Sequence, residues 1–412
     1  MRRWGWLLAL LAQPLAAQSV QPPAPQSVQI ESVQPEPATI VVAFSAAGLR
    51  TVYTAGEADR STHRRVGADD PVRVASISKL VTALGVMRLV DAGQLNLDRD
   101  VSDYLGYRLR HPQFPNQAIT LRLLLSHQSG LLDGADLYII PLGTALQQRL
   151  ADPAVWDAAH APGAGWFHYT NLNYPVVASI MERATGERFD RLMQRLVLRP
   201  LKLDACFNWS GCSAAAVSSA AVLYRAGGEV AKDDLHGAVP ACLVVAGPAG
   251  ACDLARYVPG TNGSLFSPQG GLRISVNGLA RIGQMLARRG RGFISRRAYA
   301  ELTRPQWRFD GRNGVGEGGE ADGFFCAYGL AVQTIGTRAP GCRDDLLGDG
   351  RLRIGHAGAA YGLKSGLWLD PKTGRGAAFF TSAVADDAPP GRTAFTAAEE
   401  AAAALAAKSM AP

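Results

Sequence analysis

The periodicity of apolar residues changes twice along the chain, and this change restricts the fold more than any other feature. Residues 39–59 alternate as strands do, with two apolar runs separated by a glycine turn. Residues 94–269 show several helical patterns among Gly- and Pro-rich turns. Strand patterns return over residues 324–384, and an alanine-rich helix follows them. The order predicts one antiparallel sheet built from distant segments, flanked by helices, with an all-helical lobe inserted into it.

The chain length of 412 residues suits two lobes that share an interface. We predict an α/β lobe made of residues 39–93 and 270–412. Residues 94–269 form the predicted helical lobe, so the fold class is α/β of the α+β kind.

The first 38 residues predict export. Residues 1–17 combine two arginines, a short apolar run and two small residues, as a cleaved signal peptide does. The apolar run is too short for a stable membrane span. Residues 18–38 repeat Gln-Ser-Val-Gln and are rich in proline, which is typical of a tether. We therefore expect a periplasmic or secreted protein.

The six cysteines fall into three close pairs: Cys206–Cys212, Cys242–Cys252 and Cys326–Cys342. In an exported chain, such pairs most simply predict three disulfides. Zinc is the competing interpretation, but no pair has Cys-x-x-Cys spacing or a flanking histidine pair. We predict no metal site.

The formal net charge of +7 raises the question of a nucleic-acid partner. The arginines are interpreted as scattered, without a long basic run or interleaved aromatic residues. A solvated surface explains that pattern, and we predict no nucleic-acid partner.

Ser76 and Lys79 lie three residues apart at the start of a predicted helix that ends near Gly93, so their side chains share one face. A partly desolvated lysine can take the proton of a serine hydroxyl and make it a nucleophile. The start of the helix also directs N–H groups at a developing oxyanion. The alternative is a capping serine followed by a surface lysine. Ser78 is the poorer nucleophile candidate because it is adjacent to Lys79.

Tyr169 and Asn171 lie two residues apart, and on an extended loop both side chains face one way. A phenol can relay a proton, and an amide can hold a substrate carbonyl or the lysine ammonium group. The alternative is a buried aromatic residue beside a turn-forming asparagine.

A predicted strand runs into a His-Ala-Gly sequence that begins at His356. Gly358 permits close backbone approach by a ligand. The N–H of Ala359 is a candidate partner for the N–H of Ser76 in an oxyanion hole. The alternative is a structural histidine with satisfied hydrogen bonds.

Ser-x-x-Lys, Tyr-x-Asn and His-x-Gly in this order resemble the serine β-lactamase/D-alanyl-D-alanine peptidase family, in particular its class C-like branch. The resemblance covers about residues 39–385. It includes the stretches RLVDAGQLNLDRDVSDYL, ITLRLLLSHQSGL and YTNLNYPVVASIMERATGERF. It implies a β-lactamase/transpeptidase-like fold with the active site in the cleft between the lobes.

The same resemblance implies the role of each residue. Ser76 attacks a carbonyl and becomes acylated, while Lys79 and Tyr169 handle the proton. Asn171 and His356 orient the substrate, and the two backbone N–H groups named above hold the oxyanion. No metal or organic cofactor is required.

Three further features resemble functional motifs of the family, but we assign structural roles to them. Residues 372–374 spell Lys-Thr-Gly, another motif of the family, but they follow an Asp-Pro pair between two apolar runs, which predicts a turn. Residues 275–277 spell Ser-x-Asn but lead into a helix. His127 is interpreted as structural.

Histidine occupies the position of the lysine found in many lactamases. A histidine is largely neutral above a pKa of about 6.5 and offers no permanent cation to a penicillin carboxylate. We therefore predict a D,D-peptidase- or esterase-like hydrolase of D-amino-acid peptides, esters or, weakly, β-lactams. The alternative is a non-catalytic member that binds peptidoglycan fragments or β-lactams. The sequence contains neither Gly-x-Ser-x-Gly nor His-Glu-x-x-His, which argues against an α/β-hydrolase and a zinc protease.

Overall fold

A computed structural model describes residues 36–231, 234–316, 319 and 322–410 of the chain. Its main sheet has eight strands in the order β2-β1-β15-β14-β13-β12-β11-β9, and every neighbouring pair is antiparallel. The strands are β1 (Thr39–Ser45), β2 (Leu49–Ala55), β9 (Trp307–Arg308), β11 (Ala327–Tyr328), β12 (Gln333–Ile335), β13 (Arg353–Ala360), β14 (Leu363–Asp370) and β15 (Arg375–Thr381). The predicted antiparallel sheet of distant segments is confirmed.

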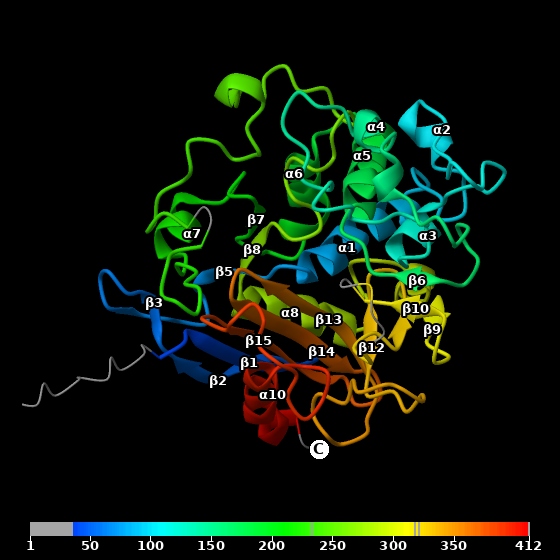
Figure 1. Cartoon of the computed structure of the whole chain (residues 1–412). Helices are drawn as coiled ribbons and strands as arrows, with labels where there is room; N and C mark the ends of the chain where they lie inside the picture. Colours follow the sequence, from blue (N-terminus) through cyan, green and yellow to red (C-terminus); the bar gives the residue numbers. More distant parts are fainter. Residues whose placement is uncertain (1–35, 232–233, 317–318, 320–321, 411–412) are drawn as a thin grey trace, which may run out of the picture. The chain divides into compact units, whose positions relative to one another are not determined.

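Strand β1 pairs with β15 in register, with Val41 opposite Phe379, which joins the two ends of the described chain in one sheet. Side chains alternate between the two faces of a strand, and here both faces are covered. Val41 and Phe379 pack against α10 (Ala397–Met410), whereas Val42 and Phe380 belong to the core on the other face. There α8 (Val276–Ala287) packs on β1, β14 and β15 (Figure 1).

The helix α1 (Ile77–Asp91) lies inside the core, between the sheet and the helical segments. It contacts β13 and α9 (Arg296–Thr303), and from Ile77 through Met87 every residue is buried. The expected end near Gly93 is confirmed, because the helix stops at Asp91 and Gly93 has φ +70°. Because α1 is packed on all sides, a side chain at its accessible N-terminal end is held in a fixed position.

Residues 94–269 hold the remaining helices and two short strands, β6 and β7, so this lobe is not wholly helical. Strand β6 (Phe167–His168) pairs with β10 (Gly314–Val315), and β7 (Cys206–Phe207) pairs with β8 (Leu272–Ser275). The helices are α2 (Ser102–Leu105), α3 (Leu121–Leu125), α4 (Leu146–Arg149), η1 (Pro153–Val155), α5 (Asn173–Thr185), α6 (Phe189–Met193), η2 (Gln194–Leu198), α7 (Ala214–Ser219) and η3 (Pro248–Gly250). Two more pairings complete the sheets: β3 (Glu57–Asp59) with β4 (Arg64–Arg65), and β5 (Pro71–Arg73) with β8.

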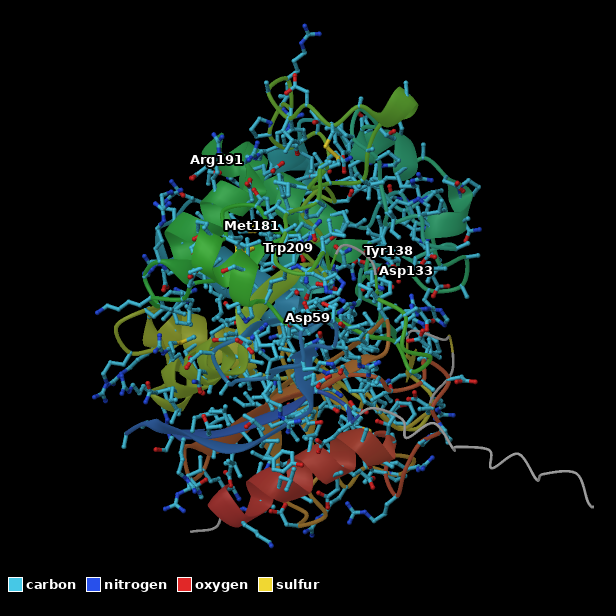
Figure 2. The ribbon with its side chains drawn as sticks, turned by 90° about the vertical axis from the view of Figure 1, so that its left-hand side faces the viewer. Asp59, Asp133, Tyr138, Met181, Arg191 and Trp209 are labelled. Atoms are coloured by element: carbon cyan, nitrogen blue, oxygen red, sulfur yellow. A yellow bond between two sulfur atoms is a disulfide. The ribbon has the colours of Figure 1, made fainter. Side chains whose placement is uncertain are left out.

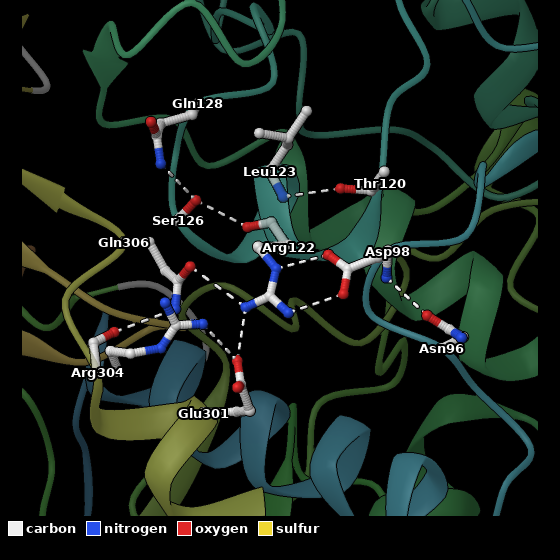
Figure 3. Close-up of polar contacts among 10 residues, drawn as sticks. All are labelled: Asn96, Asp98, Thr120, Arg122, Leu123, Ser126, Gln128, Glu301, Arg304 and Gln306. Atoms are coloured by element: carbon white, nitrogen blue, oxygen red, sulfur yellow. Dashed lines mark hydrogen bonds and ion pairs between the residues drawn. The ribbon is translucent and has the colours of Figure 1, made fainter.

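Arg122 on α3 ties the helical segments to α9. Its guanidinium group bonds both carboxylate oxygens of Asp98, at 2.6 and 2.8 Å, and Glu301 at 2.7 Å (Figure 3). Its backbone carbonyl accepts from Ser126 Oγ at 2.7 Å, and Ser126 Oγ in turn accepts from Gln128 Nε2. This network holds the loop on either side of His127 in place.

The three disulfides join the expected cysteine pairs, 206–212, 242–252 and 326–342. The predicted signal peptide, and the predicted tether up to residue 35, lie outside the described residues. In the part of the chain that the structure describes, no helix combines the length and apolarity that crossing a membrane needs.

Candidate active site

Ser76 lies at the first turn of α1, where it is the only residue from Pro71 through Met87 that is not buried. Its side chain makes no capping hydrogen bond, although it occupies the N-cap position. The preceding residue, Ala75, has φ +44°, a left-handed conformation that alanine rarely adopts. The serine hydroxyl lies within hydrogen-bond distance of Lys79 Nζ instead of capping the first turn of the helix.

Lys79 is fully buried, and three oxygen atoms surround its amine. The Nζ atom lies 3.0 Å from Ser76 Oγ, 2.7 Å from Asn171 Oδ1 and 3.2 Å from the carbonyl oxygen of Gln269. Thr82, one turn further along α1, donates to the carbonyl of Pro268 at 2.9 Å and so holds the Gln269 segment against the helix. A capping serine followed by a surface lysine is therefore excluded.

Ser78 is fully buried and has a structural task. Its hydroxyl donates to the carbonyl of Ala75 at 2.6 Å and accepts from the backbone N–H of Leu272 at 3.0 Å. These bonds join the start of α1 to β8. The proton and one lone pair of the Ser78 hydroxyl are engaged with backbone groups, and the hydroxyl makes no hydrogen bond with Lys79.

Asp133, a residue that the sequence analysis did not select, orients Asn171. Its carboxylate accepts from Asn171 Nδ2 at 2.8 Å and from the N–H of Leu172 at 2.9 Å (Asp133 is labelled in Figure 2). The amide oxygen of Asn171 is thereby turned toward Lys79 Nζ. The result is a continuous chain of hydrogen bonds from Asp133 through Asn171 and Lys79 to Ser76. The one signal for Asp133 in the sequence is its position just after the His-Gln-Ser-Gly stretch. Sequence spacing alone does not show that it contacts Asn171, which lies 38 residues further along the chain.

Tyr169 lies beside the same lysine, with its ring centroid 4.8 Å from Lys79 Nζ. The ring is stacked between two others, Phe325 at 4.6 Å and His127 at 4.5 Å, and the residue is 3% exposed. Tyr169 and Asn171 thus both face Lys79, as the two-residue spacing predicts.

His127 holds the loop that carries Tyr169. Its Nδ1 accepts from the N–H of Thr170 at 3.0 Å, and its backbone carbonyl accepts from the N–H of His168. Burial, with a smaller contribution from Lys79, lowers the pKa of His127 well below its usual value. These contacts support its interpretation as a structural residue.

His356 lies on β13 and is 1% exposed. Its Nε2 is 2.7 Å from the hydroxyl of Tyr328, and its Nδ1 is in contact with the carbonyl oxygen of Ala357. Burial lowers the pKa of His356 to about 3, and burial also raises the pKa of Tyr328 well above its usual value. A neutral imidazole with the proton on Nδ1 then accepts the phenol proton of Tyr328 at Nε2. The ring of His356 lies 6.2 Å from that of Tyr169, so the histidine is at the edge of the site.

Gly358 brings β13 against the segment that precedes Ser76. A Cβ atom at this position would lie 2.3 Å from the carbonyl oxygen of Val74 and 2.5 Å from Ser365 Oγ. The close approach is therefore made by the chain's own backbone rather than, as expected, by a ligand. Ala359, the next residue, is exposed and opposite Lys364 in the β13–β14 register. Its N–H group remains a predicted oxyanion donor.

The Lys-Thr-Gly and Ser-x-Asn sequences at residues 372–374 and 275–277 lie outside the site. Residues 372–374 form the turn between β14 and β15, in which Asp370 Oδ1 accepts from the N–H of Lys372 at 2.8 Å. Ser275 caps α8 by accepting from the N–H of Gly278, and Asn277 donates to Asp69 on the surface. Among the described residues no group of three or more His, Cys, Asp or Glu side chains is placed to hold a metal ion.

Comparison with known proteins gives relatives of several activities. Over 165 residues the chain is 34% identical to Esterase EstB of Burkholderia gladioli, which covers 37% of this chain and 42% of the esterase. Over 158 residues it is 28% identical to Penicillin-binding protein 4* of Bacillus subtilis (strain 168), covering 37% of this chain and 34% of that protein. The matched part is thus less than half the length of each curated relative.

Solved structures match over a longer part of the chain. The D-amino acid amidase from Ochrobactrum anthropi SV3 superposes with a TM-score of 0.60 at 18% identity, covering 90% of this chain and 94% of the amidase. The octameric penicillin-binding protein homologue from Pyrococcus abyssi gives 0.58 at 20% identity, covering 85% and 71%. These likenesses show the β-lactamase/transpeptidase-like fold. The sequence model of the Beta-lactamase family matches residues 33–402, and the chain therefore belongs to this family of serine hydrolases.

Proposed function

We propose that this protein hydrolyses esters or amides through an acyl-enzyme formed on Ser76. One observation carries the proposal: a buried lysine amine lies 3.0 Å from the hydroxyl of the single accessible residue at the start of α1. A serine hydroxyl is a weak nucleophile until an adjacent base takes its proton. Lys79 is the group that meets this need.

The proposed mechanism uses Lys79 in its neutral form, as a base. A neutral amine has two N–H groups and one lone pair. Two of its three neighbours, the oxygens of Asn171 and Gln269, can only accept hydrogen bonds, so they take the two N–H groups. The lone pair is then left for the third neighbour, the hydroxyl of Ser76. Asp133 keeps the amide of Asn171 in the orientation that this arrangement requires.

In the proposed reaction Ser76 Oγ attacks the substrate carbonyl while its proton passes to Lys79. The oxyanion is held by the N–H groups of Ser76 and Ala359, the first of which lies at the positive end of α1. The proton then passes, by way of Tyr169, to the leaving group, and a water molecule repeats the sequence to release the acid.

The substrate class follows from His356. Its pKa of about 3 means that the imidazole is neutral across the physiological range, so this strand supplies no cation for a penicillin carboxylate. An esterase or D-peptidase activity is therefore favoured over efficient β-lactamase activity. The curated relative named an esterase and the solved D-amino acid amidase have names in keeping with this choice.

Export is part of the proposal. Three disulfides suit an oxidising compartment, and they support the periplasmic or secreted location expected from the first 17 residues.

The test is intact mass measurement after incubation with three acyl donors: a p-nitrophenyl ester, a D-Ala-D-Ala peptide and a penicillin. We expect one acyl group per chain, with turnover of the ester or peptide and a longer-lived penicillin adduct. The alternative, a non-catalytic binding protein of the same fold, predicts saturable binding with no adduct and no product from any donor. That outcome would remove the hydrolase assignment.

A further inference from the structure

Arginines gather in one segment of the chain. Residues 288–304 contain six arginines, no lysine and one glutamate, so they carry a formal charge of +5, whereas the whole chain carries +7. All six arginine residues are exposed. The expectation that the arginines are scattered is therefore wrong, because the short runs Arg-Arg-Gly-Arg and Arg-Arg flank a turn that brings them to one surface.

Five of these arginines line a groove of about 1220 Å³. It lies between the end of α8, the loop that follows and α9, and it extends to the ends of β1 and β14 at Ala46 and Pro371. Its apolar lining includes Ile294, Tyr299 and Ile354. The arginines in the groove are Arg288, Arg289, Arg291, Arg296 and Arg304. The surface is thus cationic with an apolar part, and it is distinct from the residues around Ser76.

Four of the five groove arginines have no acidic partner in the described part of the protein. There, Arg289, Arg291 and Arg296 form no ion pair, and Arg288 donates only to the carbonyl of Ala46 at 2.9 Å. The one acidic residue of the segment, Glu301, is shared between Arg304 and Arg122 (Figure 3). Asp91, which is also close, accepts from the N–H and hydroxyl of Ser295. Like charges held together without acidic partners favour an anionic ligand.

We propose that this groove docks the protein on an anionic membrane surface by binding the phosphates of lipid headgroups. Every cation is an arginine, whose planar fork matches phosphate oxygens better than a lysine ammonium does. The groove is far larger than one phosphate, and its apolar lining suits the glycerol and upper acyl region of a lipid. Leu352, two residues before Ile354 in the sequence, is a further exposed apolar side chain, with 47% of its surface accessible.

Docking at this groove leaves the active site accessible. Strand β13 begins beside the groove, at Ile354, and carries Ala359 toward its other end. Five residues of strand span about 16 Å, so the oxyanion position lies that far along the strand from the groove. None of the residues around Ser76 lines the groove, so docking there does not occupy the proposed active site.

The test is co-sedimentation with vesicles of phosphatidylglycerol and phosphatidylcholine, or of phosphatidylcholine alone. The wild type should bind only the anionic vesicles, at ~0.05 M salt and much less at ~0.5 M. A variant with Arg288, Arg289, Arg291 and Arg296 changed to Gln should bind at least about tenfold more weakly, since each basic residue near the surface contributes to binding. Its ester turnover in solution should be unchanged, which verifies folding and separates this test from that of the proposed hydrolase.

The matched control removes the same charge elsewhere. Arg199, Arg256, Arg281 and Arg312 are exposed but lie outside the groove and outside residues 288–304, and their change to Gln should leave vesicle binding within about twofold. Equal losses in both variants would overturn the proposal, because binding would then follow net charge alone. Displacement of the vesicles by free glycerol phosphate would overturn it in favour of a soluble phosphate ligand. Tighter binding to duplex DNA, lost in the groove variant, would overturn it in favour of a nucleic acid.

Discussion

Lys79 and Lys372 both belong to three- or four-residue motifs of one enzyme family, yet they lie in opposite environments. Lys79 is fully buried, with its amine among three oxygen atoms. Lys372 is exposed in a turn closed by backbone N–H groups that donate to Asp370. The burial of a motif's lysine therefore indicates its role better than the match of the motif's sequence does. Only a lysine that is removed from solvent must either form specific hydrogen bonds or lose its proton.

The comparison also separates Lys372 from His356 on β13. In the described structure the lysine of the Lys-Thr-Gly segment is one strand and a turn away from the site, so it supplies no charge to β13. On β13 itself the buried His356 has a pKa lowered by burial, and it is the residue we propose as the third motif. The predictions below test the contrast between the buried site and the exposed turn.

The largest effect is expected at the nucleophile. Ser76→Ala should lower turnover by at least ~10³-fold and abolish labelling by a fluorophosphonate, because removal of the serine from a coupled set removes the covalent route. Ser78→Ala should keep the label, with a lower melting temperature because two backbone hydrogen bonds are lost. Peptide mapping of the labelled protein decides the matter: a label that survives Ser76→Ala and disappears in Ser78→Ala would overturn the mechanism.

His356→Ala should lower kcat/KM by about ten- to hundredfold. The imidazole holds the hydroxyl of Tyr328 beside the ring of Tyr169, and a small displacement of a catalytic group costs this much. Steady-state kinetics with the ester substrate measures the change. Wild-type kinetics in this variant would show that His356 has no part in positioning the site.

His356 should also make stability depend on pH. The folded-state pKa is about 3 and the ordinary value is 6.5, so below pH 6.5 the unfolded chain takes up a proton that the folded chain refuses. Its contribution is present above pH 6.5, is lost as the pH falls toward 3, and amounts to about 2 kcal/mol lost at pH 5.

The difference between wild type and His356→Asn isolates this contribution. Burial raises the pKa of Glu182 to about 7, which acts in the opposite direction in both proteins and therefore cancels in the difference. Urea unfolding at pH 7.5 and pH 5 should show the wild type losing more stability than the variant. Equal losses in the two proteins would mean that His356 titrates normally in the folded state.

Asp133→Ala should lower kcat about tenfold with little change in KM, because freeing the amide of Asn171 disturbs the proton acceptor rather than substrate binding. Asp133→Asn should recover part of the loss, since its amide oxygen can still accept one of the two hydrogen bonds. Asp136, exposed in the same loop, offers the control, and its change to Asn, which tolerates the left-handed backbone there, should leave kcat unchanged. A rise in KM alone would assign Asp133 to substrate binding instead.

The smallest effect is expected at the turn. Lys372→Ala should leave turnover within about twofold, because an exposed side chain far from the site contributes little to the transition state. Parallel assays with His356→Ala make the contrast direct. If the turn lysine proved essential and the histidine dispensable, the third motif would be assigned to the wrong strand.

Local chemistry made much of this protein predictable. The Asp-Pro pair determined that residues 372–374 form a turn, because proline lacks the N–H that a strand ladder needs. Helical spacing determined that Ser76 and Lys79 share a face, and short cysteine separations determined the three disulfide pairs. The order of strand and helix patterns determined a sheet of distant segments.

Tertiary structure alone decided how the site is held. Asp133 meets Asn171, His356 meets Tyr328, and the arginines after α8 meet across a groove, in each case without a periodic signal. Sequence patterns record which face of an element is buried, since that depends on neighbours three or four residues away. They do not record which distant side chain completes a buried hydrogen bond. That partner is selected only when the packed elements exclude water and leave each polar group to be satisfied by the protein.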